Sequence, residues 1–169
     1  HCNEIGINSL EYKLPATTTQ DELMSLIDKL NNDDSVHGIL VQFPLPKGLD
    51  ESAVVKAISP KKDVDGFFFF FVGGVLMNDK DCFVSCTPAG ALELIKSSGI
   101  DITGKNAVVV GRSNNVGKPM ALLLLNEGAT VTVCHSKTQN LAEITKNADI
   151  LVCAVGKAHM ITKDMVKKG

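Results

Sequence analysis

The sequence contains no tryptophan, one tyrosine and no apolar stretch long enough to cross a membrane. A membrane-spanning helix needs roughly 18 consecutive apolar residues, and the nearest candidate, residues 67–77, is interrupted by Gly73 and Gly74. An excess of positive charge is also missing: 17 Lys and Arg stand against 19 Asp and Glu, a net charge of -2. Proteins that bind nucleic acid through its phosphates need clustered cations. We therefore expect neither a nucleic-acid partner nor a membrane partner.

The cysteines also exclude two classes of protein. Their number, five, is odd, and no two of them form a Cys-x-x-Cys pair. A disulfide framework needs an even number, and a structural zinc site usually pairs its thiols at that spacing. We expect reduced, partly buried thiols in an intracellular protein and no metal site. The chain opens with His1 and Cys2, without an initiator Met or a signal peptide, so we expect a fragment of a longer protein.

The first part of the chain predicts two helices and two strands. Residues 6–14 have the pattern of a strand that runs into a turn. Thr19 and Glu22 have the spacing of a capping box, and the apolar residues that follow recur at helical spacing. The short apolar run at 38–42 is typical of a buried parallel strand. Asp50 is the expected N-cap of the second helix.

The second part of the chain alternates strands with helices. This alternation indicates βαβ units and a parallel sheet, and hence an α/β protein. The expected helices cover residues 90–98, 120–125 and 141–144, and the expected strands cover 107–110, 130–133 and 150–153.

A glycine-containing turn, residues 111–117, directly follows the first of these strands and opens a helix. Gly111 would allow the tight turn, and Gly117 would allow backbone amides and the helix N-terminus to approach a pyrophosphate. The spacing is one residue longer than in G-x-G-x-x-G, and Ser113 stands where the second glycine is usual. A plain strand–turn–helix that needs glycine only for its geometry is the alternative.

The end of the second strand distinguishes between two cofactors. An NAD site usually carries an acidic residue there, which accepts a hydrogen bond from the ribose 2′-hydroxyl. Residues 134–138 include His135, Ser136 and Lys137 but no carboxylate. Arg112 on the glycine turn would stand beside them, and a cation with a hydroxyl suits a 2′-phosphate, so the expected cofactor is NADP. His135 can equally be a packed residue at the end of the strand.

Several short motifs occur in an order that resembles one known family. VQFPLP, KDVDG and CTPAG are individually weak motifs, but together with the glycine turn and the strand ends they form a specific set. The set is similar in order and spacing to the bifunctional methylenetetrahydrofolate dehydrogenase/cyclohydrolases, from about residue 4 to the end of the chain. The matching segments are 41–46, 62–66, 86–90, 110–119, 130–138 and 148–156.

The resemblance implies an α/β fold with two lobes around a cleft. Residues 1–88 would form a folate-binding catalytic domain that lacks its N-terminus. Residues 89–169 would form a Rossmann-type NADP-binding domain that lacks its C-terminus. The family commonly dimerises, so a homodimer is expected. Its members occur in the cytoplasm and in mitochondria, and we expect the cytoplasm, with the mitochondrion as the alternative.

The implied substrate site centres on two residues. Gln42 matches the glutamine that lies near the family's catalytic lysine and helps to position the folate. Asp65 matches the carboxylate that accepts N–H groups from the pterin ring, since one carboxylate can accept two such bonds. Pro44 and Leu45 belong to the same substrate-binding segment as Gln42. Taken alone, Gln42 can be a strand-end amide and Asp65 a turn former before Gly66.

The implied cofactor site uses the three strand ends. Arg112 and Ser136 would hold the 2′-phosphate, the glycine turn would hold the pyrophosphate, and the segment after the third strand would contact the ribose. The full set is Gly111, Arg112, Ser113, Val116, Gly117, His135, Ser136, Val155 and Gly156.

The implied activity is a step of one-carbon metabolism that supplies purine biosynthesis. NADP would oxidise 5,10-methylenetetrahydrofolate to the methenyl compound, and water would then open its ring to give 10-formyltetrahydrofolate. The family's catalytic lysine would fall before His1, so the isolated fragment is expected to be inactive. A non-catalytic member that acts as a binding module and another Rossmann dehydrogenase are the alternatives.

The chain departs from the family pattern at two places. Residues 67–71 are five consecutive phenylalanines, where the family usually has a mixed loop. Such a run predicts an exposed apolar patch, which would serve as a partner surface or favour aggregation. Ser85 stands where a proline is common before the Cys-Thr-Pro motif.

Overall fold

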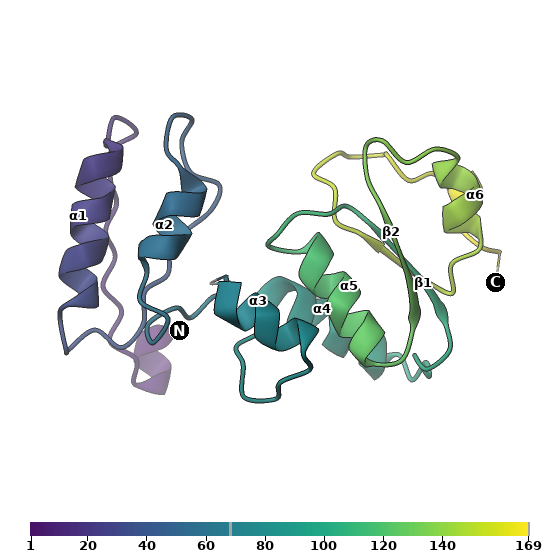
Figure 1. The fold of residues 1–169 in the computed structure, drawn as a ribbon, viewed down its shortest axis with the longest axis horizontal. Coiled ribbons are helices and arrows are strands. Elements are labelled where there is room, and N and C mark those ends of the chain that lie inside the picture. Colours follow the sequence, from purple (N-terminus) through teal and green to yellow (C-terminus); the bar gives the residue numbers. More distant parts are fainter. Residues whose placement is uncertain (68, 169) are drawn as a thin grey trace. The chain divides into compact units, whose positions relative to one another are not determined.

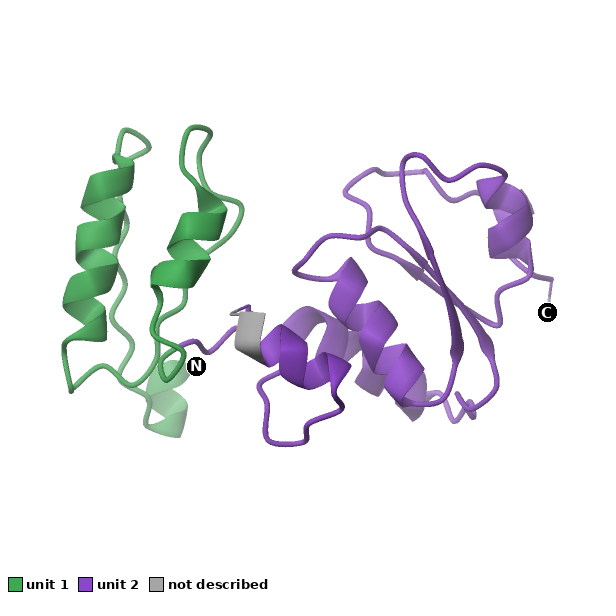
Figure 2. Ribbon diagram, viewed as in Figure 1, with its two compact units in different colours: residues 1–62 green, residues 63–169 purple. Residues whose placement is uncertain are grey.

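A computed structural model of the chain describes residues 1–67 and 69–168, without the side chains of Phe69 and Phe70. These residues form two compact units, unit 1 with residues 1–62 and unit 2 with residues 63–169 (Figure 2). The expected boundary between a folate-binding and an NADP-binding domain, at residues 88 and 89, stays a prediction. The boundary between two compact units need not coincide with the boundary between two functional domains. The cleft expected between the two lobes also stays a prediction.

Unit 1 contains a 3₁₀ helix, Cys2–Ile5, and two α-helices, α1 (Gln20–Asn31) and α2 (Glu51–Ala57) (Figure 1). The predicted capping box of α1 is confirmed. Thr19 Oγ1 accepts from Glu22 N at 3.3 Å, and Glu22 Oε2 accepts from Thr19 N at 2.8 Å. The predicted cap of α2 is confirmed as well, since Asp50 Oδ1 accepts from Ala53 N at 3.0 Å.

The core of unit 1 lies between these two helices and the chain segment beside them. Apolar residues one helical turn apart on α1 are buried together, as helical periodicity requires. They pack with one residue of α2, the residue that follows α2 and one residue of the segment between the helices. The buried members are Leu23, Ile27, Ile39, Val54 and Ile58.

The two strands predicted for unit 1 are wrong. Residues 7–15 have no regular secondary structure and their side chains are exposed. The apolar run at 38–42 makes one bridge, at Ile39, whose N–H donates to Lys62 O at 2.7 Å. An apolar pattern identifies residues that are suited to burial, but a strand also needs a neighbour that pairs with its N–H and C=O groups along its length. Within the described residues, the run at 38–42 has such a neighbour only at Ile39.

The second unit is built on the predicted parallel sheet. Its strands are β1 (Asn106–Val110), β2 (Thr130–Cys134) and β3 (Ile150–Cys153), in the order β2-β1-β3 with both pairs parallel. Central strand β1 is apolar because both of its faces are covered, and Val108, Val109 and Val110 are all 0% exposed. The α/β fold with a parallel sheet is thereby confirmed.

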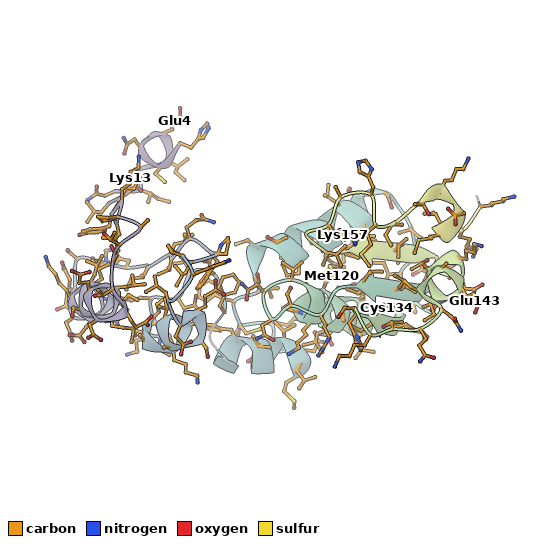
Figure 3. All side chains as sticks on the ribbon, turned by 90° about the horizontal axis from the view of Figure 1, so that it is seen from above. Glu4, Lys13, Met120, Cys134, Glu143 and Lys157 are labelled. Atoms are coloured by element: carbon orange, nitrogen blue, oxygen red, sulfur yellow. The ribbon has the colours of Figure 1, made fainter. Side chains whose placement is uncertain are left out.

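Helices cover both faces of this sheet. Ala107 and Val109 of β1 face α4 (Cys86–Ser97) and α5 (Gly117–Asn126), with Leu92, Met120 and Leu124 packed against them. Figure 3 labels Met120 among the side chains of α5. The alternate residues, Val108 and Val110, face α6 (Leu141–Lys146) and residues 160–161 on the other side. A short 3₁₀ helix, Lys163–Met165, follows.

The phenylalanine run leads into helix α3 (Phe69–Leu76). The patch predicted over residues 67–71 lies partly outside the described residues, since Phe68 and the side chains of Phe69 and Phe70 are not described. Of the two described side chains, Phe67 is half-buried and Phe71 is 9% exposed, so the prediction of exposure is wrong for these two. Phe71 packs edge-to-face on Phe83 with ring centroids 5.4 Å apart, which buries it.

Residues 1–67 and 69–168 contain no helix that is long and apolar enough to span a membrane. Among the same residues, no three His, Cys, Asp or Glu side chains gather where they could hold a metal ion. All five cysteines are free thiols, of which Cys134, at the end of β2, is buried and Cys2, Cys86 and Cys153 are exposed.

Two adjacent leucines of α5 provide a matched test of this packing. Leu124 is 0% exposed in the core beneath the sheet, whereas Leu125 is 54% exposed. Leu124→Ala should lower the free energy of unfolding by about 2–5 kcal/mol, because it removes buried methyl groups and leaves a cavity. Leu125→Ala should change it by less than about 0.5 kcal/mol. Urea denaturation measures both, and equal losses would contradict the assigned packing.

Candidate functional site

The carboxyl ends of the three strands meet at one edge of the sheet. Val110 of β1 is in register with Cys134 of β2 and with Cys153 of β3. Two hydrogen bonds extend the ladder beyond the strands: Gly111 N donates to Cys134 O at 2.8 Å, and Ala154 N donates to Val110 O at 2.7 Å. The residues that follow each strand are therefore held side by side, where open α/β sheets usually bind their ligands.

Two glycines make the close approach at this edge possible. Gly111 has φ +120°, and a Cβ built on it would lie 2.2 Å from Ala154 O. A Cβ on Gly117, the first residue of α5, would lie 2.3 Å from Gly111 O. No side chain larger than hydrogen fits at either position while the backbone stays in place. The start of α5 is thus packed directly on the end of β1.

Ser113 closes the glycine turn with its own side chain. Its Oγ accepts from Val116 N at 3.3 Å and from Gly117 N at 3.2 Å, and its carbonyl accepts from Lys118 N at 3.0 Å. The two amides expected to approach a phosphate are therefore satisfied internally. The first turn of α5 carries no acidic residue, so the positive end of the helix dipole is not neutralised there.

The loop after β2 is a compact turn in which His135 takes part. His135 N donates to Thr138 Oγ1 at 2.8 Å, and His135 Nδ1 accepts from Lys137 N at 3.1 Å. His135 is half-buried and Ser136 is exposed. The imidazole thus holds the loop together, and Ser136 is exposed at the edge of the sheet.

The predicted cofactor residues fall on the three adjacent loops of this edge. Arg112 and Gly156 are exposed, and Val155 is half-buried in the core cluster beneath α6. Cations and hydroxyl groups are present on these loops, and residues 111–118 and 134–138 contain no carboxylate. The structure brings the predicted segments together at one edge, and their contacts with a cofactor stay a prediction.

Asp65 lies on a turn shaped by a neighbouring carboxylate. Asp63, which is buried, accepts from Asp65 N and Gly66 N through Oδ1, both at 3.0 Å. Asp65 itself is half-buried. Its partial burial, and to a lesser extent the negative charge of Asp63, raises the pKa of the Asp65 carboxyl group above its ordinary value. A carboxylate in this setting gains from any ligand that donates N–H groups to it.

Gln42, Pro44 and Leu45 lie in unit 1, on an irregular segment that contains a cis peptide bond between Phe43 and Pro44. Gln42 is exposed and donates from Nε2 to Phe43 O at 3.2 Å. Leu45 N donates to Glu51 Oε1 at 2.9 Å, which anchors the segment to the start of α2. Their role towards a substrate stays a prediction.

Sequence reasoning missed two residues that shape the carboxyl edge of the sheet, where the three strands end. The backbone of Ala154 lies against Gly111, and a small residue directly after an apolar strand was the available signal. Ser85 donates from Oγ to Asn115 O at 3.0 Å. No local pattern indicates that bond, because the two residues are 30 positions apart.

Two family models match most of the chain. The model of the tetrahydrofolate dehydrogenase/cyclohydrolase catalytic domain matches residues 1–65, and that of the NAD(P)-binding domain of the same enzymes matches residues 85–169. The chain belongs to the tetrahydrofolate dehydrogenase/cyclohydrolase family. The NAD(P)-binding match includes the whole β2-β1-β3 sheet and its glycine turn.

Individual family members are similar over nearly the whole chain. The bifunctional protein FolD of Acetivibrio thermocellus is 61% identical over 99% of this chain and 59% of its own length. The crystal structure of FolD from Campylobacter jejuni has a TM-score of 0.92 at 49% identity and covers 99% of this chain and 60% of that one. The Trypanosoma brucei enzyme, solved with NADP and an inhibitor, has a TM-score of 0.93 at 37% identity, with 99% of this chain and 58% of that chain covered. The chain thus spans about three fifths of the length of the curated relatives it matches.

The close packing in the glycine turn at residues 111–117 can be tested with a matched pair of substitutions. Gly117→Ala should lower the free energy of unfolding by about 1–3 kcal/mol or more, because its methyl group would overlap Gly111 O. Gly90→Ala, on helix α4 with nothing within 4 Å of the added methyl group, should raise it by about 0.5–1 kcal/mol. Thermal or urea unfolding distinguishes the two. A Gly117→Ala protein as stable as wild type would show that the turn is looser than described.

The raised pKa of Asp65 predicts a pH dependence of stability. Because the folded-state pKa lies above the unfolded-state value, the favourable contribution exists at low pH and is lost as the pH rises through the folded pKa. Asp65→Asn abolishes this loss. The stability of the variant minus that of wild type should therefore increase as the pH rises from about 4 to 7. Urea unfolding at a series of pH values measures the difference, and a difference independent of pH would contradict it.

Proposed function

We propose that this protein is an NADP-dependent methylenetetrahydrofolate dehydrogenase with methenyltetrahydrofolate cyclohydrolase activity. One observation carries the proposal: the ends of three parallel strands lie side by side, and the first of them leads into a glycine turn that begins a helix. Residues 111–118 and 134–138 at this edge carry cations and hydroxyl groups and no carboxylate. The family to which the chain belongs supplies the substrate class. The Trypanosoma brucei relative, solved with NADP, supports the cofactor.

The residues at the sheet edge fit a dinucleotide with a 2′-phosphate. The exposed guanidinium of Arg112 and the hydroxyl of Ser136 would bind that phosphate. NAD sites usually carry a carboxylate after the second strand, which would repel a 2′-phosphate, and this chain has none there. The hydroxyl hydrogen of Ser113 would donate to a pyrophosphate oxygen, since its oxygen already accepts from two amides. Gly111, Val116 and Gly117 would shape that turn, and the turn around His135 would present Ser136. Val155 and Gly156 would contact the ribose.

On the substrate side, Asp65 would accept N–H groups of the pterin, which stabilises a carboxylate that is partly buried beside Asp63. Gln42 would position the folate, and Pro44 and Leu45 would line the same substrate segment. In this assignment residues 1–88 form the folate-binding catalytic domain and residues 89–169 the NADP-binding domain.

The proposed reaction has two steps. When bound, NADP supplies the acceptor for a hydride from the methylene bridge. Water then adds to the methenyl carbon, a proton is released and a C–N bond breaks to give 10-formyltetrahydrofolate.

Two further assignments complete the proposal. The curated relative from Acetivibrio thermocellus is bacterial, which favours the cytoplasm over the mitochondrion. A homodimer is the proposed assembly, on the basis of the family resemblance alone. Product supply to purine biosynthesis follows from the formyl group that the second step generates.

The deciding experiment is an activity assay with both cofactors in parallel. It is performed on this chain and on a version extended to the length of its relatives, with 5,10-methylenetetrahydrofolate as substrate. Formation of NADPH and of the methenyl compound is followed by absorbance. Turnover by the extended protein that favours NADP supports the proposal, and a folded extended protein with no turnover on either cofactor would refute it.

The 2′-phosphate assignment has its own test. Arg112→Gln should weaken binding of NADP about tenfold, because it removes a charge-assisted hydrogen bond, and should leave binding of NAD nearly unchanged. Lys105→Gln is the matched control, since Lys105 precedes β1 and lies at the opposite edge of the sheet. Isothermal titration measures both ligands. Equal effects of Arg112→Gln on NADP and NAD would refute the role of Arg112.

A further inference from the structure

Ser85 makes an unexpected contact at the start of helix α4. Serine is among the preferred N-cap residues, where its oxygen normally accepts from an amide of its own helix. Ser85 is the N-cap of α4, yet its side chain makes no such bond. Its Oγ instead donates to Asn115 O at 3.0 Å, and the residue is only 6% exposed. The hydroxyl is thus committed to the glycine turn and not to its own helix.

Asn115 is an informative partner because of its place in the turn. Its carbonyl and the N–H of Val116 belong to one peptide plane and point in opposite directions. Holding the Asn115 carbonyl therefore fixes the direction of the Val116 N–H, which donates to Ser113 Oγ at 3.3 Å. Gly117 N donates to the same oxygen at 3.2 Å. The buried hydroxyl of Ser85 thereby helps to orient the hydroxyl of Ser113, which is the group proposed to donate to the pyrophosphate.

The backbone beside Ser85 also contacts the Asp65 turn. A Cβ built on Gly66, which has φ +68°, would lie 3.0 Å from Phe83 O and 3.2 Å from Ser85 N. Gly66 itself follows Asp65 and is held by Asp63. Residues 83–85 are therefore packed on the substrate turn and bonded to the cofactor turn, all within unit 2.

We propose that Ser85 is a positioning residue for the cofactor: its hydroxyl holds the glycine turn in the conformation that binds NADP and fixes it to the segment that carries Asp65. The proposal rests on the proposed function. It concerns a position where this chain departs from the pattern that the family resemblance implies, because the proline expected there has no hydroxyl with which to make the contact.

The backbone of Ser85 allows a test that separates the hydroxyl from the fold. Its φ of −50° and ψ of 131° suit proline, and within the described part of the chain its N–H donates no hydrogen bond. Ser85→Pro should therefore fold with a stability close to that of wild type, because the rigidity of proline offsets the lost hydrogen bond of the hydroxyl. Ser85→Ala lacks it without the added rigidity, and Ser85→Thr retains it. Ser97→Ala is the matched control, since Ser97 Oγ donates to Leu94 O of its own helix.

The first readout is NADP affinity, measured by isothermal titration on the chain. Ser85→Pro and Ser85→Ala should both bind NADP about three- to tenfold more weakly, the effect of losing one hydrogen bond. Ser85→Thr and Ser97→Ala should stay within about twofold of wild type. Wild-type affinity in Ser85→Pro would overturn the proposal, even if Ser85→Ala were weakened, because the hydroxyl would then not matter.

The second readout does not need a cofactor. Amide hydrogen exchange at Val116 and Gly117 should be faster in Ser85→Pro than in wild type, while exchange in the core of β1 is unchanged. Equal exchange at the two amides would overturn the proposal. A wild-type chain that does not bind NADP would instead count against the proposed function, and the exchange experiment would still decide the role of Ser85.

Discussion

The packing of the end of β1 against the start of α5 and the end of β3 is the contact on which the rest of unit 2 depends. Gly111 and Gly117 allow it, since a Cβ on either would lie within 2.3 Å of a carbonyl oxygen. This approach brings the helix N-terminus to the carboxyl edge of the sheet and places the three loops side by side. A larger residue at either position would separate the elements that form the candidate cofactor site.

Close approach of backbone segments creates polar groups that need partners, and two serines supply them. Ser113 accepts from two amides at the start of α5. Ser85 donates to the one carbonyl whose orientation controls the first of those amides. The turn is therefore ordered before any ligand arrives, and less conformational entropy is lost when an anion binds there.

The sequence predicted the elements of unit 2 well and the strands of unit 1 poorly, for one physical reason. Strands β1, β2 and β3 pair with one another within the chain, and β1 is buried on both faces, so its apolar run was a sufficient signal. The runs at 6–14 and 38–42 have the same local character, but pairing depends on a neighbouring strand, which a local pattern does not contain. Likewise, the pattern of residues 67–71 predicted exposure, but an edge-to-face contact with Phe83 buries Phe71.

The sequence by itself determined the family, the α/β class, the glycine turn, the capped helices and the absence of a carboxylate after β2. These follow from residue types at short spacing, where stereochemistry and helical or strand periodicity act directly. Only the tertiary structure decided that Ser85 bonds to Asn115, that Ala154 receives Gly111 and that Asp65 is partly buried beside Asp63 with a raised pKa. Such contacts depend on where the folded backbone places each residue, and the spacing of residues along the chain does not encode that placement locally.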